Sequence, residues 1–251
     1  MGSWRLEWIR MWRTKRIVAL VATFVLLGVA GPIVLHYLPE LIKAGSKQGM
    51  QGLVVPKVQP VQGIINLGNN VSSIGTLVVA IVAAATLGVD SNRAIAAFYR
   101  SRLRSPLALI LPRLTSSAVA AITALALGAL AAWYETEVLL GSVPFVALAG
   151  GFLLEALWLC FVVALTAFYA SVLRSVAGAA GAAVASLLAL AITGAVPHLS
   201  PWLPNRLSGS LASLIGQSAG DIWKAILVAV VGTIGLAALS IRLFAGREPA
   251  S

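Results

Sequence analysis

Six long apolar segments restrict what this chain can fold into. Each approaches or exceeds the roughly 20 residues that an α-helix needs to cross the hydrocarbon core of a bilayer. Because lipid offers the backbone no hydrogen-bond partners, a single segment of this kind crosses as a helix. The predicted spans lie near residues 17–38, 64–89, 107–133, 145–171, 176–197 and 222–244. The sequence therefore predicts an all-α membrane protein with six transmembrane helices.

The composition agrees with a bilayer environment and argues against several other classes. Hydrophobic residues make up 59% of the 251 residues and charged residues only 10%, which is more apolar side chain than one water-soluble core can bury. The net charge of +10 would suggest nucleic acid in a soluble protein, but the basic residues lie between the apolar segments. We expect lipid, and no nucleic acid, as a partner. The single cysteine, Cys160, excludes an internal disulfide and a cysteine-based metal site.

Lysine and arginine are unevenly distributed over the connections, which predicts an orientation. Thirteen of them precede the first span, flank the second-to-third and fourth-to-fifth connections, or follow the last span, whereas five lie in the alternate connections. Basic flanks resist translocation across the membrane. Both termini are therefore expected on the cytoplasmic side.

Residues 3–16 combine three tryptophans with basic residues ahead of the first span. One stripe of a helix would carry Trp4, Trp8, Met11 and Trp12. This pattern predicts an amphipathic helix in the membrane interface, with its arginines near anionic phosphates. The alternative is an ordinary basic flank that only fixes topology.

Residues 198–221 form a long connection after the fifth span, on the predicted outer side. Their apolar part, residues 207–215, is too short to cross the bilayer. This predicts a re-entrant or interfacial segment with Trp202 at headgroup depth. Since no repeat or low-complexity linker divides the chain, residues 1–251 are expected to form a single transmembrane domain.

Residues 91–105 follow the second span and are rich in arginine. Asp90 or Ser91 is placed to cap a short helix there. Phe98 and Tyr99 would then stand as aromatic anchors between Arg93, Arg100 and Arg102. Such a surface suits docking on a soluble partner; the alternative is a solvated basic loop that enforces orientation.

This arrangement resembles the type-2 ATP-binding-cassette (ABC) permeases, the membrane subunits of many bacterial exporters. The resemblance covers nearly the whole chain, from the basic N-terminal helix through six spans to a re-entrant outer connection. It is sharpest over residues 88–114, because in such permeases an acidic residue after the second span opens a cytoplasmic coupling helix and a basic stretch with proline leads into the third. This sequence has Asp90 where glutamate is more usual, and it lacks the Gly-Thr pair expected shortly afterwards.

The resemblance implies that this chain forms the transport path and that a different polypeptide binds and hydrolyses ATP. Residues 91–105 would transmit closure of an ATPase dimer to the spans, in a bacterial cytoplasmic membrane. The implied coupling residues are Asp90, Arg93, Phe98, Tyr99, Arg100 and Arg102. The chain has no G-x-x-x-x-G-K-[ST] loop, so we expect ATP on a separate P-loop ATPase subunit and no cofactor in this chain. Alternating access would also need a second permease copy or a homologous permease.

Polar residues inside the spans are the candidates for a translocation path. Glu155 is the only acidic residue well inside a span, where a carboxylate costs at least about 2.5 kcal/mol. It is expected either to line the path or to hydrogen-bond a neighbouring helix. Asn69 and Asn70 belong to a polar stretch in the outer half of the second span, which either lines a vestibule or packs against neighbours.

Together these features predict the permease subunit of an ATP-driven exporter for a hydrophobic or amphipathic drug, lipid or peptide, and not an enzyme. An ion-coupled secondary transporter is the main alternative, although such proteins usually carry paired intramembrane charges. A membrane-embedded hydrolase is a weaker one, since Ser210 with His36 or His198 lacks a third orienting group. A structural subunit of a larger assembly is the remaining alternative.

Overall fold

The protein is a multi-pass, all-α membrane protein. The computed structural model describes residues 3–46, 59–88, 106–213 and 222–246. Over these ranges every regular element is a helix, and six helices are long and apolar enough to cross a membrane, which confirms the predicted fold class. The predicted coupling residues lie outside the described residues: Asp90, Arg93, Phe98, Tyr99, Arg100 and Arg102.

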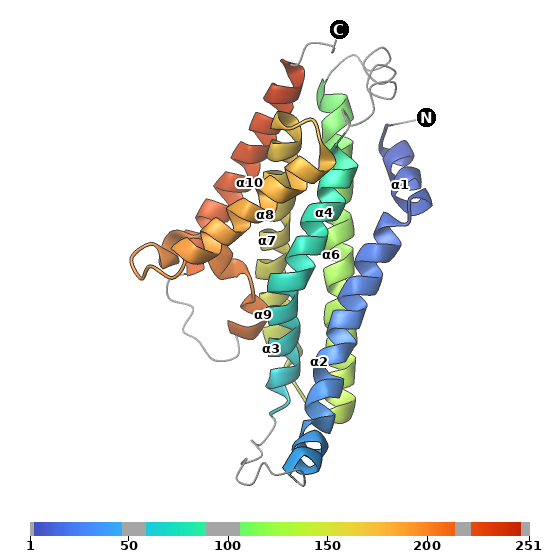
Figure 1. Ribbon diagram of the computed structural model, residues 1–251, viewed down its shortest axis with the longest axis vertical. Helices are drawn as coiled ribbons and strands as arrows, with labels where there is room; N and C mark the ends of the chain where they lie inside the picture. Colours follow the sequence, from blue (N-terminus) through green and yellow to red (C-terminus); the bar gives the residue numbers. More distant parts are fainter. Residues whose placement is uncertain (1–2, 47–58, 89–105, 214–221, 247–251) are drawn as a thin grey trace.

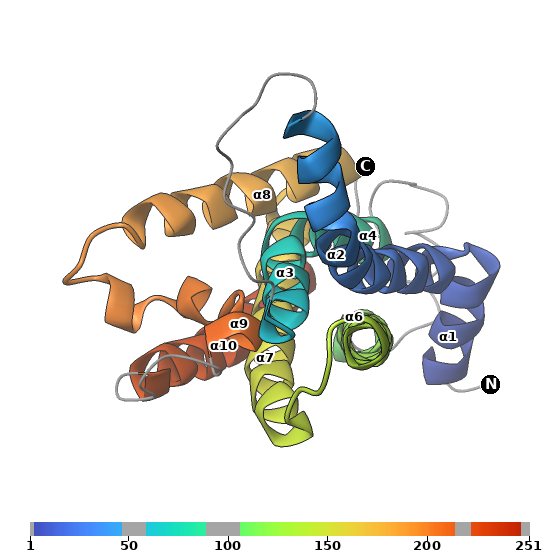
Figure 2. The same cartoon turned by 90° about the horizontal axis from the view of Figure 1, so that it is seen from below.

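The N-terminal part forms two helices, α1 (Ser3–Arg13) and α2 (Arg16–Ser46). Lys15 between them has φ of 54°, in the left-handed region, and there the chain turns from α1 into the first span. α1 packs on α6 (Pro106–Leu139), which also lies along α2 (Figures 1 and 2). α1 is thus held by the spans rather than lying alone in the interface.

The expected stripe of apolar residues on α1 is wrong in part. Met11 is fully buried, whereas Trp4 and Trp12 are 49% and 60% exposed. Glu7, expected on another face, is buried beside Met11, one turn away. α1 therefore docks through Glu7 and Met11, and its exposed surface mixes tryptophan with arginine, as suits headgroup depth.

The second span is irregular: α3 (Val61–Asn70) and α4 (Thr76–Leu87) are joined by the π-helical turn η1 (Val71–Gly75). The sequence predicted the span but not this turn. In a π turn a backbone N–H donates to the carbonyl five residues earlier, whereas in an α turn it donates to the carbonyl four residues earlier. Thr76 Oγ1 donates across it to the Val71 carbonyl oxygen at 3.0 Å.

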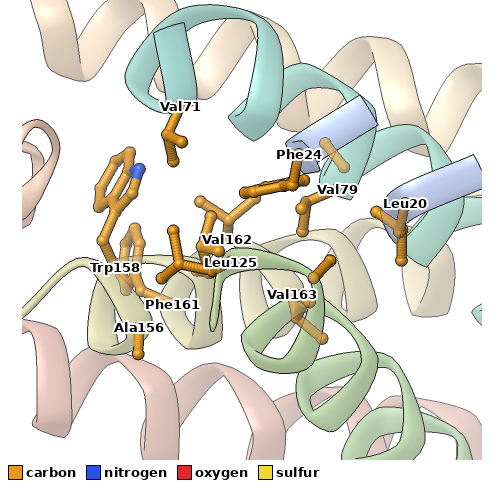
Figure 3. Packing of buried hydrophobic residues seen from close by; sticks show 14 of the residues in the cluster. Leu20, Phe24, Val71, Val79, Leu125, Ala156, Trp158, Phe161, Val162 and Val163 are labelled. Carbon is orange, nitrogen blue, oxygen red and sulfur yellow. The ribbon is translucent and has the colours of Figure 1, made fainter. Parts of the chain in front are cut away.

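The central helix is α7 (Phe145–Val172), the most buried of the six spans. It contacts α4 and α6 as well as α8 (Val176–Thr193) and α10 (Ile222–Ala245). Its residues Trp158, Phe161 and Val162 lie in one cluster with Phe24 and Leu125 (Figure 3). α8 and α10 are the least buried spans and lie at the side of the bundle.

The fifth span ends earlier than predicted, at Thr193 rather than near Pro197. Asn205 Nδ2 donates to the Leu190 carbonyl oxygen at 2.8 Å, which also accepts from the Gly194 backbone N–H at 2.9 Å, and so ties the following segment to the last turn of α8. The chain then continues through η3 (Ser200–Trp202), η4 (Pro204–Leu207) and α9 (Ser210–Ser213). α9 packs on α3 and α7, and η4 on α7 and α10, partway along the bundle (Figure 1).

Candidate functional site

A cavity of about 550 Å³ lies between the π turn, α7, α8 and the segment that returns after α8. Its polar lining residues are Asn69, Ser72, Ser73, Thr76, Asn205 and Ser208. Leucines of α4 and α8 complete the wall, and two of them, Leu77 and Leu188, are 40% and 59% exposed. The cavity therefore opens at the surface of the bundle, where α8 diverges from α4 (Figures 1 and 2).

The π turn contributes two serine hydroxyls to the polar wall, and each of them also donates to a backbone carbonyl of the preceding turn. Ser72 Oγ donates to the Gly68 carbonyl oxygen at 2.8 Å, and Ser73 Oγ donates to that of Asn69 at 2.9 Å. Side chains that bond the preceding turn in this way are tolerated in apolar surroundings. π turns are frequent at functional sites in helices, which favours a binding role for this one.

Trp158 of α7 is part of the inner wall of the cavity and is held there by a hydrogen bond. Its indole Nε1 donates to Thr76 Oγ1 at 3.2 Å, and the residue is 3% exposed. In Figure 3, Trp158 lies near Val71 of the π turn, at the edge of the buried cluster. This hydrogen bond gives the buried indole N–H its partner and ties α7 to the start of α4.

Glu155 lies one turn before Trp158 and is fully buried behind the wall, so it is not a lining residue. Its Oε2 accepts a hydrogen bond from the Gly209 backbone N–H at 2.8 Å. Gly209 lines the cavity and has φ of 78°, a left-handed conformation that favours glycine. The adjacent Ser210 Oγ donates to the Gly151 carbonyl oxygen at 3.1 Å. Glu155 thus holds the returning segment against α7.

Of the two predicted asparagines, Asn69 lines the cavity and Asn70 does not. Ser210, considered above as a nucleophile, is 1% exposed and donates its hydroxyl to a carbonyl. Sequence reasoning missed three lining residues, Asn205, Ser208 and Trp158. No helical periodicity or spacing relates residues 200–209, or a tryptophan of the fourth span, to the second span. The in-span Glu155 was the one signal that a partner segment had to lie nearby.

A second polar cluster, also missed, lies near the ends of α1, α4 and α6. Arg113 Nε donates to Glu7 Oε1 at 2.9 Å, and the two side chains are only 1% and 6% exposed. Arg16 Nη1 donates at 3.3 Å to Oγ1 of Thr86, the last residue but one of α4. The N-terminal helices are therefore bonded to both helices that flank residues 89–105.

The role of Glu155 can be tested with two substitutions of similar size. Glu155→Leu is expected to be about 1 to 3 kcal/mol less stable than Glu155→Gln, because only glutamine keeps an oxygen that accepts the Gly209 N–H. Thermal unfolding of the purified variants in one detergent measures the difference. Equal midpoints for the two variants would show that this hydrogen bond does not hold the segment.

Comparison with known proteins gives one informative similarity. The chain is 24% identical over 205 residues to the uncharacterized transmembrane protein YxlG of Bacillus subtilis (strain 168), which covers 80% of this chain and 79% of that protein. No protein-family model matches the chain. No solved structure matches it either. The similarity to a transmembrane protein agrees with the six spans.

Proposed function

We propose that this chain is the permease subunit of an ATP-driven ABC exporter in a bacterial cytoplasmic membrane, with both termini in the cytoplasm. The observation that carries the proposal is the polar cavity at the π turn of the second span. α4 runs directly from this cavity to Leu87, shortly before the predicted coupling segment at residues 91–105. One 12-residue helix, about 18 Å long, would thus link the candidate translocation path with the segment proposed to contact the ATPase.

The second polar cluster supports transmission of force to the spans. Thr86 on α4 is bonded to Arg16, and Arg113 on α6 to Glu7. A displacement of residues 89–105 would move the ends of α4 and α6, and these contacts would pass it to α1 and α2. Packed helices joined by buried polar contacts move as units rather than deform continuously.

The position of Glu155 favours an exporter driven by a separate ATPase over an ion-coupled transporter. Ion coupling usually needs an intramembrane carboxylate facing the substrate path. Glu155 lies behind the wall and accepts from the Gly209 backbone N–H, and the described cavity lining itself contains no carboxylate. The substrate, a hydrophobic or amphipathic molecule, would be moved by conformational change of the spans.

Two protein partners complete the proposed transporter: a separate P-loop ATPase and a second permease, either another copy or a homologue. Small residues Ala177, Gly181 and Ala185 are exposed on one face of α8. Small residues let a helix of another subunit approach closely in a membrane. The first half of α8, residues 177–185, supports pairing of two permeases, and Leu188 lies beyond it.

The ATPase partner can be tested by co-purification from the native membrane. A P-loop ATPase is expected to co-purify with the chain, and Arg93→Glu combined with Phe98→Ala is expected to weaken the association by about tenfold, as for loss of an interface hot spot. The matched control is Arg206→Glu with Trp202→Ala, which changes an exposed basic and aromatic pair in the segment that follows α8. Equal recovery of the ATPase with both double variants would contradict the proposal.

A further inference from the structure

The described lining of the cavity contains no ionisable side chain. Glu155 is the nearest carboxylate along α7, and it is fully buried behind Gly209. A charged group that enters a cavity within the membrane loses hydration, and only an opposite charge or several hydrogen bonds can offset this cost. The lining therefore disfavours a charged ligand of either sign.

On the π-turn side of the cavity, the lining offers more hydrogen-bond acceptors than free donors. Each hydroxyl has one donor and two lone pairs, and Ser72 and Ser73 already donate to backbone carbonyls of the preceding turn. Thr76 and Trp158 also use their donors, on Val71 and on Thr76 respectively. The π-turn side of the cavity thus presents mainly acceptors, and these match a ligand that brings its own donors.

The other side of the cavity is apolar and open to the surface. Leu187 of α8 is nearly buried in the wall, and Leu77 and Leu188 lie where the cavity meets the outside of the spans. On a membrane-spanning bundle this surface faces acyl chains. An aliphatic chain can therefore lie against these leucines while the polar end of the same molecule reaches the π turn.

We infer that the cavity binds an uncharged amphiphile from the bilayer whose polar end carries hydroxyl or amide N–H donors, with its aliphatic part between α4 and α8. As the substrate of the exporter this ligand rests on the proposed function, but its binding does not require the ATPase. Ser72 and Ser73 are the residues that accept from its polar end, and Asn69 and Asn205 add amide groups at the same depth.

Photolabelling of the purified chain in phosphatidylcholine nanodiscs tests this inference. Four probes share one 16-carbon chain with a diazirine near its polar end: a monoacylglycerol, the methyl ester of the same acid, the free acid, and a trimethylammonium amphiphile. The monoacylglycerol probe is expected to label peptides covering residues 69–77 and 184–191 at least about fivefold more than each other probe. Unlabelled monoacylglycerol should compete this labelling away.

Matched variants separate the cavity from general lipid contact. Ser72→Ala with Ser73→Ala should reduce labelling of these peptides about fivefold, because both acceptors are lost. Thr123→Ala should leave it unchanged, because Thr123 is an exposed residue of α6 whose hydroxyl also bonds its preceding turn, at 2.8 Å from the Val119 carbonyl oxygen. Equal labelling by the ester or a charged probe would overturn the inference, as would equal loss in both variants.

The two proposals fail separately in these experiments. Selective labelling without a co-purifying ATPase would leave the binding site standing and remove the exporter. A co-purifying ATPase that depends on Arg93 and Phe98, with unselective labelling, would support the exporter and overturn the ligand class.

Discussion

Arg113→Ala is expected to lower the free energy of unfolding by about 3 to 5 kcal/mol, the typical effect of removing one partner from a buried ion pair. Arg113 lies inside α6 with 1% of its side chain exposed, and its guanidinium donates to the equally buried Glu7. Alanine leaves the Glu7 carboxylate in this buried site with the partly exposed Arg10, 3.6 Å away, as its remaining ion-pair partner in the described structure. Thermal or denaturant unfolding of purified protein in a single detergent measures the loss.

The control for this substitution is Arg242→Ala, which removes an exposed arginine from the last turn of α10. It should change stability by less than about 0.5 kcal/mol. Replacing Glu7 and Arg113 together with leucine should recover most of the loss, because an apolar pair can take the place of a buried ion pair. If Arg113→Ala behaves like Arg242→Ala, the ion pair does not hold α1 on α6.

Gly28→Ala is the second substitution with a large expected effect, because α2 and α6 touch at this point. A Cβ on Gly28 would overlap the Gly128 carbonyl oxygen, and a Cβ on Gly128 would lie 2.6 Å from the Phe24 carbonyl oxygen. Both obstacles are backbone atoms, so the helices must separate to admit a methyl group. A cost of about 1 to 3 kcal/mol is expected from such overpacking, with poor recovery of folded protein by size-exclusion chromatography.

Gly235→Ala in α10 is the matched control, since a Cβ at this position meets no atom within 4 Å. It is expected to leave stability unchanged or slightly higher, because alanine favours a helix more than glycine does. Gly128→Ala should cost about as much as Gly28→Ala, and the two costs should not add, because both act on one contact. Similar losses in all three variants would show that α2 and α6 do not depend on this close approach.

The length of the apolar segments was enough to predict the spans, because each must satisfy its backbone internally wherever it packs. Their contacts could not be predicted in the same way. Arg113 was counted with the basic residues around the second-to-third connection, whereas the structure bonds it to Glu7, 106 residues earlier in the sequence. Counting basic residues as flanks of the spans says nothing about such a partner, because it considers only which side of the membrane they occupy.

The candidate site was predictable in its polarity and not in its shape. Asn69 and its neighbouring hydroxyls were recognised as an unusual polar stretch, and Glu155 as an acid within a span that either lines the path or bonds a neighbouring helix. The return of residues 200–213 against α3 and α7 could not be foreseen, because short 3₁₀ turns leave no periodic pattern. The predicted contacts of Arg93 and Phe98 with an ATPase remain predictions.

The buried face of the second span continues through the π turn. Ile64 and Leu67 are buried before it, Val71 and Gly75 at its two ends, and Thr76 and Val79 after it. Because a π turn closes over one residue more than an α turn, deletion of one residue between 71 and 75 is expected to convert it into an α turn. Part of this wall of the cavity would then be lost, while the buried residues before and after the turn would keep their neighbours.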